Sequence, residues 1–370
     1  MRNSWKRASG VAVAIVVVAA LAAGCGSNSS SGSTGSTSGS GASSSGGIAN
    51  AKATVDKYAA NPPLEVSPLP SPPKASTYAI QVNCTIPACA PGAMKAAMDA
   101  LGWKFQEMTY DISKGPSALQ AALTQAIAAK PDVILFGANF PEATFQQQID
   151  QGGKDGIKFI DIGGVLTPGY AACIQCQESL GALGGLAADI ALADAGSKVD
   201  IAVPSDNSIA PLKAEVDGIK QEVAKNGDGS KVLDVPQSVS ATSAENASRL
   251  VSFLQRNPSV KYVVGTEKFL PPAALNSAGL GSRVKLVGLY PLNASEVADV
   301  KDGRVLSYAV GELASLYWRA ADAAARAVQG VKVDPIAPIQ SLRVMNKDNA
   351  DVSLLDPANY ADIYKKAWQK

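Results

Sequence analysis

The sequence from residue 117 to residue 136 reads SALQAALTQAIAAKPDVILF and joins a helical pattern to a strand pattern. Leu119, Leu123 and Ile127 recur at helical spacing, which predicts a helix with one apolar face. Lys130 precedes a proline, and the residue before a proline disfavours helix, so we expect the helix to end there. The apolar run VILF that follows predicts a short buried strand.

Similar strand and helix patterns alternate through the rest of the chain. This alternation indicates βαβ units around parallel sheets, and therefore an α/β fold. The chain divides into two halves of similar pattern, near residues 76–195 and 197–303, so we expect two lobes. The expected strands span residues 78–82, 104–110, 133–136, 159–162, 199–203, 232–235, 262–264, 284–289 and 305–310.

The N-terminus has the pattern of an export signal. Three basic residues among the first seven precede an unbroken apolar run over residues 11–23, which is too short to span a bilayer. Small residues then lead into Cys25, and LAAGC at residues 21–25 resembles a bacterial lipobox, whose cysteine receives a diacylglyceryl group. We therefore expect a signal peptide over residues 1–24 and a lipoprotein anchored at the extracytoplasmic face of the cell membrane. An ordinary secreted protein is the alternative.

Two segments without the pattern of a packed domain follow the predicted signal. Residues 25–48, which include the lipidated cysteine, are mostly Ser and Gly and should form a flexible tether. Residues 49–75 combine a short helical pattern with a proline-dense connector, which we expect to be extended rather than packed. The globular part should therefore start near Ser76.

Charge and composition exclude several classes of function. The chain has 33 basic and 32 acidic residues, and removal of the three basic residues of the signal leaves 30 against 32. Such a body lacks the basic stripe that phosphate contacts need, so we expect no nucleic-acid partner.

Enzymatic motifs are also missing from the sequence. The chain has no histidine, the commonest general base and metal ligand, and no Gly-x-Ser-x-Gly elbow. Gly181, Gly184 and Gly185 open a helical pattern but lack the spacing and the lysine of a phosphate-binding loop, so we interpret them as a site of close packing. We expect no enzymatic activity, no cofactor and no metal site.

The remaining four cysteines fall as two close pairs, Cys84 with Cys89 and Cys173 with Cys176. They can form two disulfides in an oxidising compartment, with three possible connectivities. We favour the two local pairs, with pairing between the two loops as the next choice. A zinc site of four thiolates is a further alternative, which the spacing and the missing histidine disfavour.

Four short phrases resemble the type I periplasmic binding proteins of the ribose-binding class. They are ALGW at residues 100–103, KPDVI at 130–134, LGGLAA at 183–188 and VGL at 287–289. The resemblance implies two doubly wound parallel-sheet lobes joined by three crossover strands. The N-terminal lobe would span residues 76–195 and 311–334, and the C-terminal lobe residues 196–308 and 338–370.

The resemblance also implies a function. The protein would be a monomeric solute-binding lipoprotein that captures a small organic molecule and delivers it to the membrane permease of an ABC importer. A ligand-binding sensory lipoprotein that reports to a membrane kinase is the alternative.

The expected ligand site follows from the sheet topology. In open α/β sheets ligands bind beyond the carboxyl ends of the strands, so the residues just after each strand should build the site. We expect polar contacts from Asn83, Asn139, Asp206, Glu267 and Lys268, and ring contacts from Phe140 and Tyr290. The alternative for each polar residue is an ordinary loop end or helix cap. Other residues after strands are Thr85, Gly163, Gly164, Asn207, Gln237, Phe269 and Glu312.

The chain departs from the pattern of pyranose-binding members of this class. Gly163 and Gly164 stand where Asp-Arg is usual, and Glu215 stands where an arginine is usual. Glu267-Lys268 replaces the usual Asn-Asp, and Tyr290 replaces the usual Asp. We therefore expect a solute that is sugar-like or polyol-like, or bulkier and less polar than a simple hexose.

Overall fold

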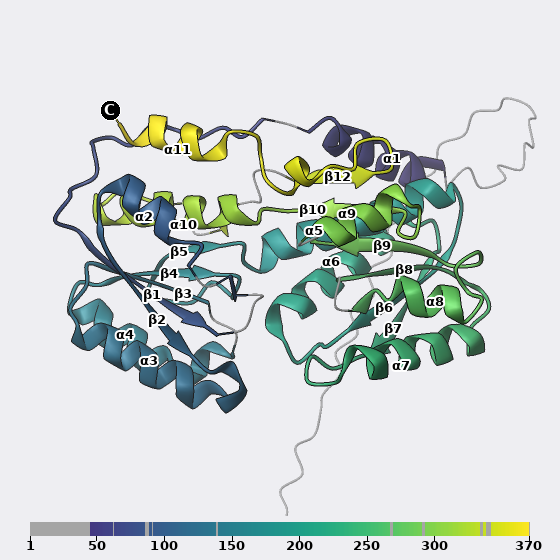
Figure 1. Cartoon of the computed structure of the whole chain (residues 1–370), viewed down its shortest axis with the longest axis horizontal. Coiled ribbons are helices and arrows are strands. Elements are labelled where there is room, and N and C mark those ends of the chain that lie inside the picture. The colour runs from purple at the N-terminus through teal and green to yellow at the C-terminus, as the bar shows by residue number, and fades with distance from the viewer. Residues whose placement is uncertain are drawn as a thin grey trace, which may run out of the picture. The chain divides into compact units, whose positions relative to one another are not determined.

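The computed structural model of the chain describes residues 45–61, 63–85, 89–90, 92–137, 140–266, 269–290, 293–333, 336–337 and 342–369. These residues form two α/β lobes, each built on a six-stranded sheet, as Figure 1 shows. The predicted signal peptide, Cys25 and residues 26–44 lie outside the described residues. None of the described helices has the length and apolar character that crossing a membrane requires.

The first sheet is parallel throughout, with the strand order β11-β5-β4-β3-β1-β2. Because β1 pairs with both β2 and β3, the strand order reverses at β1, and such a switch point opens a crevice at the carboxyl ends of the strands. The strands are β1 (Tyr78–Cys84), β2 (Lys104–Tyr110), β3 (Val133–Phe136), β4 (Lys158–Ile162), β5 (Tyr170–Ile174) and β11 (Ile336–Ala337).

The second sheet has the order β12-β10-β9-β8-β6-β7 and is parallel except for the antiparallel pair β10 and β12. Its switch point lies at β6, which pairs with both β7 and β8. The strands are β6 (Asp200–Ser205), β7 (Lys231–Pro236), β8 (Val260–Thr266), β9 (Lys285–Leu289), β10 (Ser307–Val310) and β12 (Arg343–Asn346). The predicted α/β class with two sheets is confirmed.

Helices flank both sheets (Figure 1). The first lobe has α2 (Lys95–Leu101), α3 (Pro116–Ala128), α4 (Gln146–Lys154), α10 (Ala314–Val328) and α11 (Tyr360–Trp368). The second lobe has α1 (Ser45–Ala59), α5 (Gln177–Ala195), α6 (Ala210–Asn226), α7 (Ser243–Arg256), α8 (Pro272–Ser277) and α9 (Ala294–Lys301). Short 3-10 turns lie at Ile112–Lys114, Glu142–Thr144 and Val352–Leu355.

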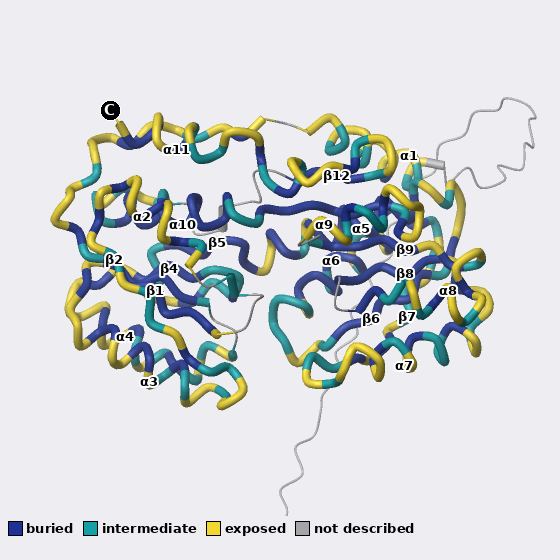
Figure 2. The backbone as a smooth tube through the Cα atoms, in the orientation of Figure 1, coloured by how far each residue is buried: buried dark blue, intermediate teal, exposed yellow. Residues whose placement is uncertain are grey.

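Side chains of each sheet alternate between two apolar clusters, one on each face. In β1, Ala79 joins one cluster, whereas Ile80 and Val82 join the other. In β6, Ile201 and Ala202 are divided in the same way. Strands that are buried on both faces need apolar residues at nearly every position. Figure 2 shows the central strands buried along most of their length.

Helix α5 belongs to the second lobe, which corrects the expected lobe boundary. Leu183, Leu186 and Ala187 of α5 lie in the same buried cluster as Ile201 of β6. The strand before this helix, β5, pairs with β4 in the first sheet and was not predicted. Its sequence, YAACI, offers small residues rather than a β-branched run, so its strand signal is weak. The first crossing between the lobes therefore lies at residues 174–177 and not near residue 195.

Helix α1 and the connector are packed, which corrects a second expectation. Ala51 is fully buried in the cluster of the second lobe, and Val55 packs against that cluster. In the connector, Leu64 and Leu69 are buried in the cluster of the first lobe. Burying these side chains stabilises the docked segment, so the globular part includes residues 45–75.

The C-terminal helix returns to the first lobe, although residues 338–370 were assigned to the second. Trp368 of α11 stacks on Trp318 of α10 with ring centroids 5.5 Å apart, and its Nε1 donates to Asp322 at 2.9 Å. The backbone N–H of Leu69 donates to the carbonyl of Ala367 at 2.8 Å. The N-terminal connector and α11 thus add two passages between the lobes to the three crossovers that were expected.

The glycines of α5 permit its close contact with α6. A Cβ on Gly184 would overlap the backbone of Glu215, and a Cβ on Gly218 would overlap the backbone of Gly181. Only hydrogen at these positions lets the two helices approach so closely. The interpretation of these α5 glycines as a packing site is confirmed.

Candidate functional site

The carboxyl ends of the strands carry the predicted site residues. Asn83 lies at the end of β1 and Phe140 follows β3 in the first lobe, while Asp206 follows β6 and Tyr290 follows β9 in the second. The further candidates Asn139, Glu267 and Lys268 lie outside the described residues.

Asn83 holds the loop that follows β1. Its Nδ2 donates to the carbonyl of Cys89 at 2.9 Å and to Glu107 Oε1 at 3.0 Å. Its Oδ1 accepts from the backbone N–H of Cys84 at 3.0 Å. A disulfide also joins Cys84 to Cys89, so two contacts connect Cys89 to the end of β1.

Phe140 is half-buried and packs against the apolar cluster that contains Phe136 and Phe145. The structure therefore places its ring at the boundary between the core of the first lobe and the loop after β3. A ring in this position has one supported side and can cover the apolar face of a ligand with the other.

Asp206 joins two loops of the second lobe. Its Oδ1 accepts from the N–H and the hydroxyl of Ser208, at 3.1 and 2.6 Å. Its Oδ2 accepts from the backbone N–H of Val239, which follows β7, at 2.9 Å. Asp206 thus fixes the loops after β6 and β7 relative to each other.

Tyr290 lies against the second crossing between the lobes, residues 311–313, which joins β10 to α10. It has a positive φ of 52°, which is unusual for a residue with a large side chain. A Cβ on Gly311 would lie 2.5 Å from the Tyr290 ring, so the ring fills space that only glycine leaves open. Burial raises the pKa of the Tyr290 hydroxyl well above its usual value, and the nearby carboxylates of Glu215 and Glu312 raise it further.

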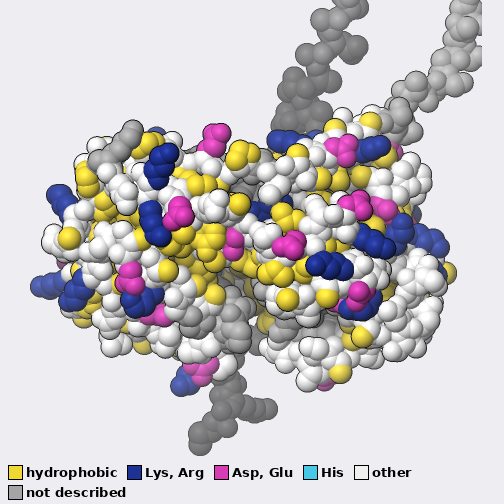
Figure 3. All heavy atoms as spheres, turned by 45° about the horizontal axis from the view of Figure 1, so that its top comes forward, with side chains coloured by type: hydrophobic (Ala, Val, Ile, Leu, Met, Phe, Trp, Pro, Cys, Tyr) yellow, Lys and Arg dark blue, Asp and Glu magenta, His cyan; other side chains and the backbone are white. Residues whose placement is uncertain are grey.

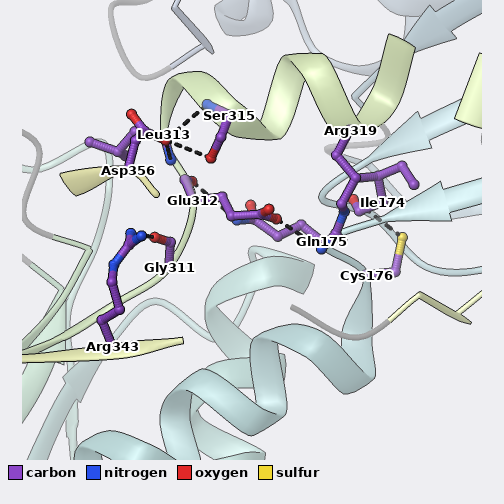
Figure 4. Close-up of polar contacts among 10 residues, drawn as sticks. All are labelled: Ile174, Gln175, Cys176, Gly311, Glu312, Leu313, Ser315, Arg319, Arg343 and Asp356. Carbon is purple, nitrogen blue, oxygen red and sulfur yellow. Dashed lines mark hydrogen bonds and ion pairs between the residues drawn. The ribbon is translucent and has the colours of Figure 1, made fainter. Parts of the chain in front are cut away.

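A buried ion pair lies where the second crossing enters the first lobe. The carboxylate of Glu312 lies 2.8 Å from Nη1 of Arg319 on α10. The Nε2 of Gln175, which lies in the first crossing, donates to the backbone carbonyl of Glu312 at 3.3 Å. Figure 4 shows these side chains and marks their contacts with Glu312 by dashed lines. Two crossings and one helix of the first lobe are therefore joined at a single residue.

Arg343, the first residue of β12, also contacts the second crossing. Nη2 of Arg343 on β12 donates to the carbonyl of Gly311 at 2.7 Å and to that of Leu355 at 3.1 Å (Figure 4). Burial lowers the pKa of the Arg343 guanidinium to about 10, which still leaves it charged at neutral pH. We call Gln175, Gly311, Glu312, Arg319 and Arg343 the hinge network.

Asp356 caps the helix that follows the second crossing. Its carboxylate accepts from the backbone N–H groups of Leu313, Ala314 and Ser315 at 2.8 to 3.0 Å, and from the Ser315 hydroxyl at 2.6 Å (Figure 4). An anion is stabilised at this end of a helix because the first N–H groups lack partners within the helix.

The second disulfide encloses part of the hinge network. Cys173 and Cys176 are bonded, and Gln175 between them has a positive φ of 57°. The disulfide restricts a turn of four residues and thereby holds the Gln175 amide toward Glu312.

Sequence patterns did not reveal Gln175, Arg319, Arg343 or Asp356 as parts of this site. One signal was available for Arg319, because it interrupts the alanine-rich apolar pattern of α10 and is buried at 4% exposure. A charge at such a position needs a buried partner.

The fold is that of a two-lobed α/β protein, in which the chain passes between the two sheets beside the buried ion pair of Glu312 and Arg319. The sequence matches the family model for the periplasmic binding protein domain over residues 90–332, and the chain belongs to this family. No curated protein matches the sequence.

Several solved structures share the fold of this chain. The glucose-galactose binding protein GanP from Geobacillus stearothermophilus has a TM-score of 0.64 and 18% identity, over 75% of this chain and 100% of its own. An ABC transporter solute binding protein from Burkholderia graminis, in complex with D-arabinose, has a TM-score of 0.64 and 19% identity, over 76% of this chain and 98% of its own. A periplasmic solute binding protein from Actinobacillus succinogenes with bound D-allose has a TM-score of 0.63 and 16% identity, over 74% of this chain and 99% of its own.

Proposed function

We propose that this protein is an extracytoplasmic solute-binding lipoprotein that captures a small organic solute and delivers it to the permease of an ABC importer. The hinge network carries the proposal, because a clamp needs two lobes that pivot about a defined point, and Gln175 of the first crossing, Arg319 of α10 and Arg343 of β12 all contact Gly311 or Glu312. Structural relatives that bind D-arabinose, D-allose, glucose and galactose favour a sugar-like or polyol-like solute. A bulkier, less polar solute is the other candidate.

In this proposal the solute binds beyond the two switch points. Asn83, Asn139, Asp206, Glu267 and Lys268 provide or position polar contacts, while Phe140 and Tyr290 cover apolar faces. The solute contacts both lobes, so its binding favours the closed arrangement, which would then be recognised by the permease. No step of this capture and release alters a covalent bond of the solute.

The proposed location follows from the N-terminal sequence. A lipid on Cys25 and the Ser/Gly tether would keep the monomeric binding protein beside the membrane and its permease. The face in Figure 3 carries acidic and basic side chains interspersed, with no basic stripe for nucleic acid on that face.

Thermal unfolding of the full-length protein tests solute capture. The panel is D-glucose, D-galactose, D-arabinose, D-allose, D-fucose and myo-inositol. A solute at one hundred times its dissociation constant stabilises the folded state by about 2.7 kcal/mol, which raises Tm by several degrees. No shift with any solute would contradict capture of a sugar or polyol.

A second experiment separates transport from sensing. Deleting the gene should abolish cellular uptake of the radiolabelled solute that shifts Tm. Unchanged uptake, together with a lost transcriptional response to that solute, would favour the sensory lipoprotein.

A further inference from the structure

The N-terminal segment of the globular part is attached to both lobes. We call residues 45–71, which comprise α1 and the start of the connector, the strap. Helix α1 packs on the second lobe, whereas Leu64 and Leu69 of the connector are buried in the first. Residues 60–63 alone separate α1 from Leu64. A fully extended chain from Ala59 to Leu64 spans at most about 18 Å, so the two attachments are joined by a short link.

One face of α1 fixes the strap to the second lobe. The helix contacts α5, α6 and β12. Gly47 lies so close to α6 that a Cβ there would be 2.6 Å from the carbonyl oxygen of Asn226. Ala51 is 0% exposed, and Val55 and Tyr58 pack against the same apolar cluster. Burial of this face stabilises the contact, so α1 should move together with the second lobe.

Helices α10 and α11 hold the connector on the first lobe. Nη2 of Arg326 on α10 donates to the carbonyl of Ser67, and Nε2 of Gln329, which follows α10, donates to that of Ser71 at 2.8 Å. The backbone of Leu69 is bonded to α11. Because α5 follows the first crossing and α10 follows the second, the strap contacts the two helices that the crossings enter.

The strap and the proposed solute site lie on opposite sides of the second crossing. In Figure 1, α1 and α11 lie above β10 and α10, whereas β1 and β6 lie below them. The loops after β1 and β6 belong to the proposed solute site. When two lobes close about a hinge, groups on one side of the hinge approach and groups on the other side separate. The two attachments of the strap should therefore move apart when the lobes close on a solute.

We propose that the strap opposes closure of the lobes and thereby lowers the affinity for the solute. Separating its two attachments requires the short link to extend or one attachment to loosen. Either change offsets part of the free energy that solute binding contributes to closure. This inference rests on the proposed function and concerns the regulation of that site rather than its contacts.

Lengthening the link tests the proposal without removing any buried contact. Gly-Ser-Gly-Ser inserted after Asn61 in the full-length protein should allow closure without extension of the strap. Isothermal titration calorimetry would use the solute of the panel that raises the Tm of wild type most. We expect its dissociation constant to fall about fivefold or more. The same insertion after Ser38, in the predicted tether, is the matched control and should leave the constant unchanged.

A second variant loosens one attachment instead of the link. Leu69→Ala removes part of a buried side chain from the first lobe and should also lower the dissociation constant. Ile127→Ala is its control, because Ile127 is buried near the end of α3, away from the strap and from the carboxyl ends of the strands. It should lower Tm as a core substitution does but leave the constant unchanged.

The outcomes separate the strap from the proposed function. If wild type binds a solute and the variant lengthened after Asn61 binds it equally or more weakly, the strap does not oppose closure, and the proposed function stands. If that variant does not fold, Leu69→Ala decides by the same criterion. If wild type binds no solute of the panel, the proposed function and the role of the strap both fail.

Discussion

The carboxylate of Glu312 lies 2.8 Å from the guanidinium of Arg319, and their side chains are 0% and 5% exposed. Glu312 belongs to the crossing that leaves the second sheet, whereas Arg319 belongs to the helix that covers the first sheet. Motion of one lobe against the other must therefore preserve or break a buried ion pair. In the proposed clamp, this pair would be the point about which the lobes pivot.

Removing one partner of this ion pair should destabilise the protein strongly. We expect Arg319→Met to lower the free energy of unfolding by about 3–5 kcal/mol, because it leaves the Glu312 carboxylate buried without a counter-charge. The double variant Arg319→Met/Glu312→Leu should be more stable than Arg319→Met. Urea denaturation measures both. Lys95→Met, which breaks an exposed pair with Asp99, is the control and should cost less than about 1 kcal/mol. A similar small cost for Arg319→Met would contradict the assignment.

The contact between α5 and α6 should not tolerate a methyl group. Gly218→Ala places a Cβ into the backbone of Gly181 and should lower the free energy of unfolding by about 2–3 kcal/mol. Gly153→Ala is the matched control, since a Cβ there meets nothing within 4 Å and alanine favours helix by about 1 kcal/mol. Thermal denaturation should show the two variants shifting Tm in opposite directions. Equal shifts would mean that the helices can separate without cost.

Docking of α1 should contribute to the stability of the second lobe. Ala51→Glu places a carboxylate in the apolar cluster of that lobe, so we expect a lower Tm and faster proteolysis of the N-terminal segment. Ala53→Glu changes an exposed residue of the same helix and should leave both unchanged. An N-terminal helix that is only a tether would respond equally to the two substitutions.

Asp189 should make stability depend on pH. Burial raises the pKa of its carboxyl to about 6, although the Nδ2 of Asn226 donates to it at 3.0 Å. A raised folded-state pKa means that the folded protein binds the proton more tightly than the unfolded chain does. This stabilisation is present below about pH 4 and is lost as the pH rises through about 6.

The substitution Asp189→Asn should remove this dependence. The variant should be more stable than wild type at pH 7.5, by at most about 3 kcal/mol, and the difference should shrink toward pH 4. Urea denaturation between these pH values measures the slope. Asp217→Asn, on the exposed side of α6, is the control and should leave the slope unchanged. A wild-type slope that survives in Asp189→Asn would assign the pH dependence to another group.

Local patterns predicted the elements that are long and periodic. The apolar stripe Leu119, Leu123 and Ile127 predicted α3 correctly, because these three side chains are buried on one side of a single helix. Strand β5 was missed because its small residues give a weak strand signal. The docking of α11 was missed because it depends on contacts with residues that are distant in the sequence. Trp368 is buried by stacking on Trp318, and no local sequence pattern predicts a contact between residues so far apart.

In the candidate site, too, local patterns predicted some residues, whereas others depend on contacts between distant parts of the chain. The residues after the strands were identifiable because the sheet topology fixes where strand ends meet. The hinge network was not identifiable, because Gln175 and Glu312 are 137 residues apart and their contact depends on how two crossings pass each other.

Hydrogen–deuterium exchange of the full-length protein, with and without each solute of the panel, tests most directly whether a solute is held between the lobes. We predict that one solute protects the loops after β1 and β3 of the first lobe together with the loops after β6, β7 and β8 of the second. Protection confined to one lobe, or no protection with any solute, would contradict capture between the lobes.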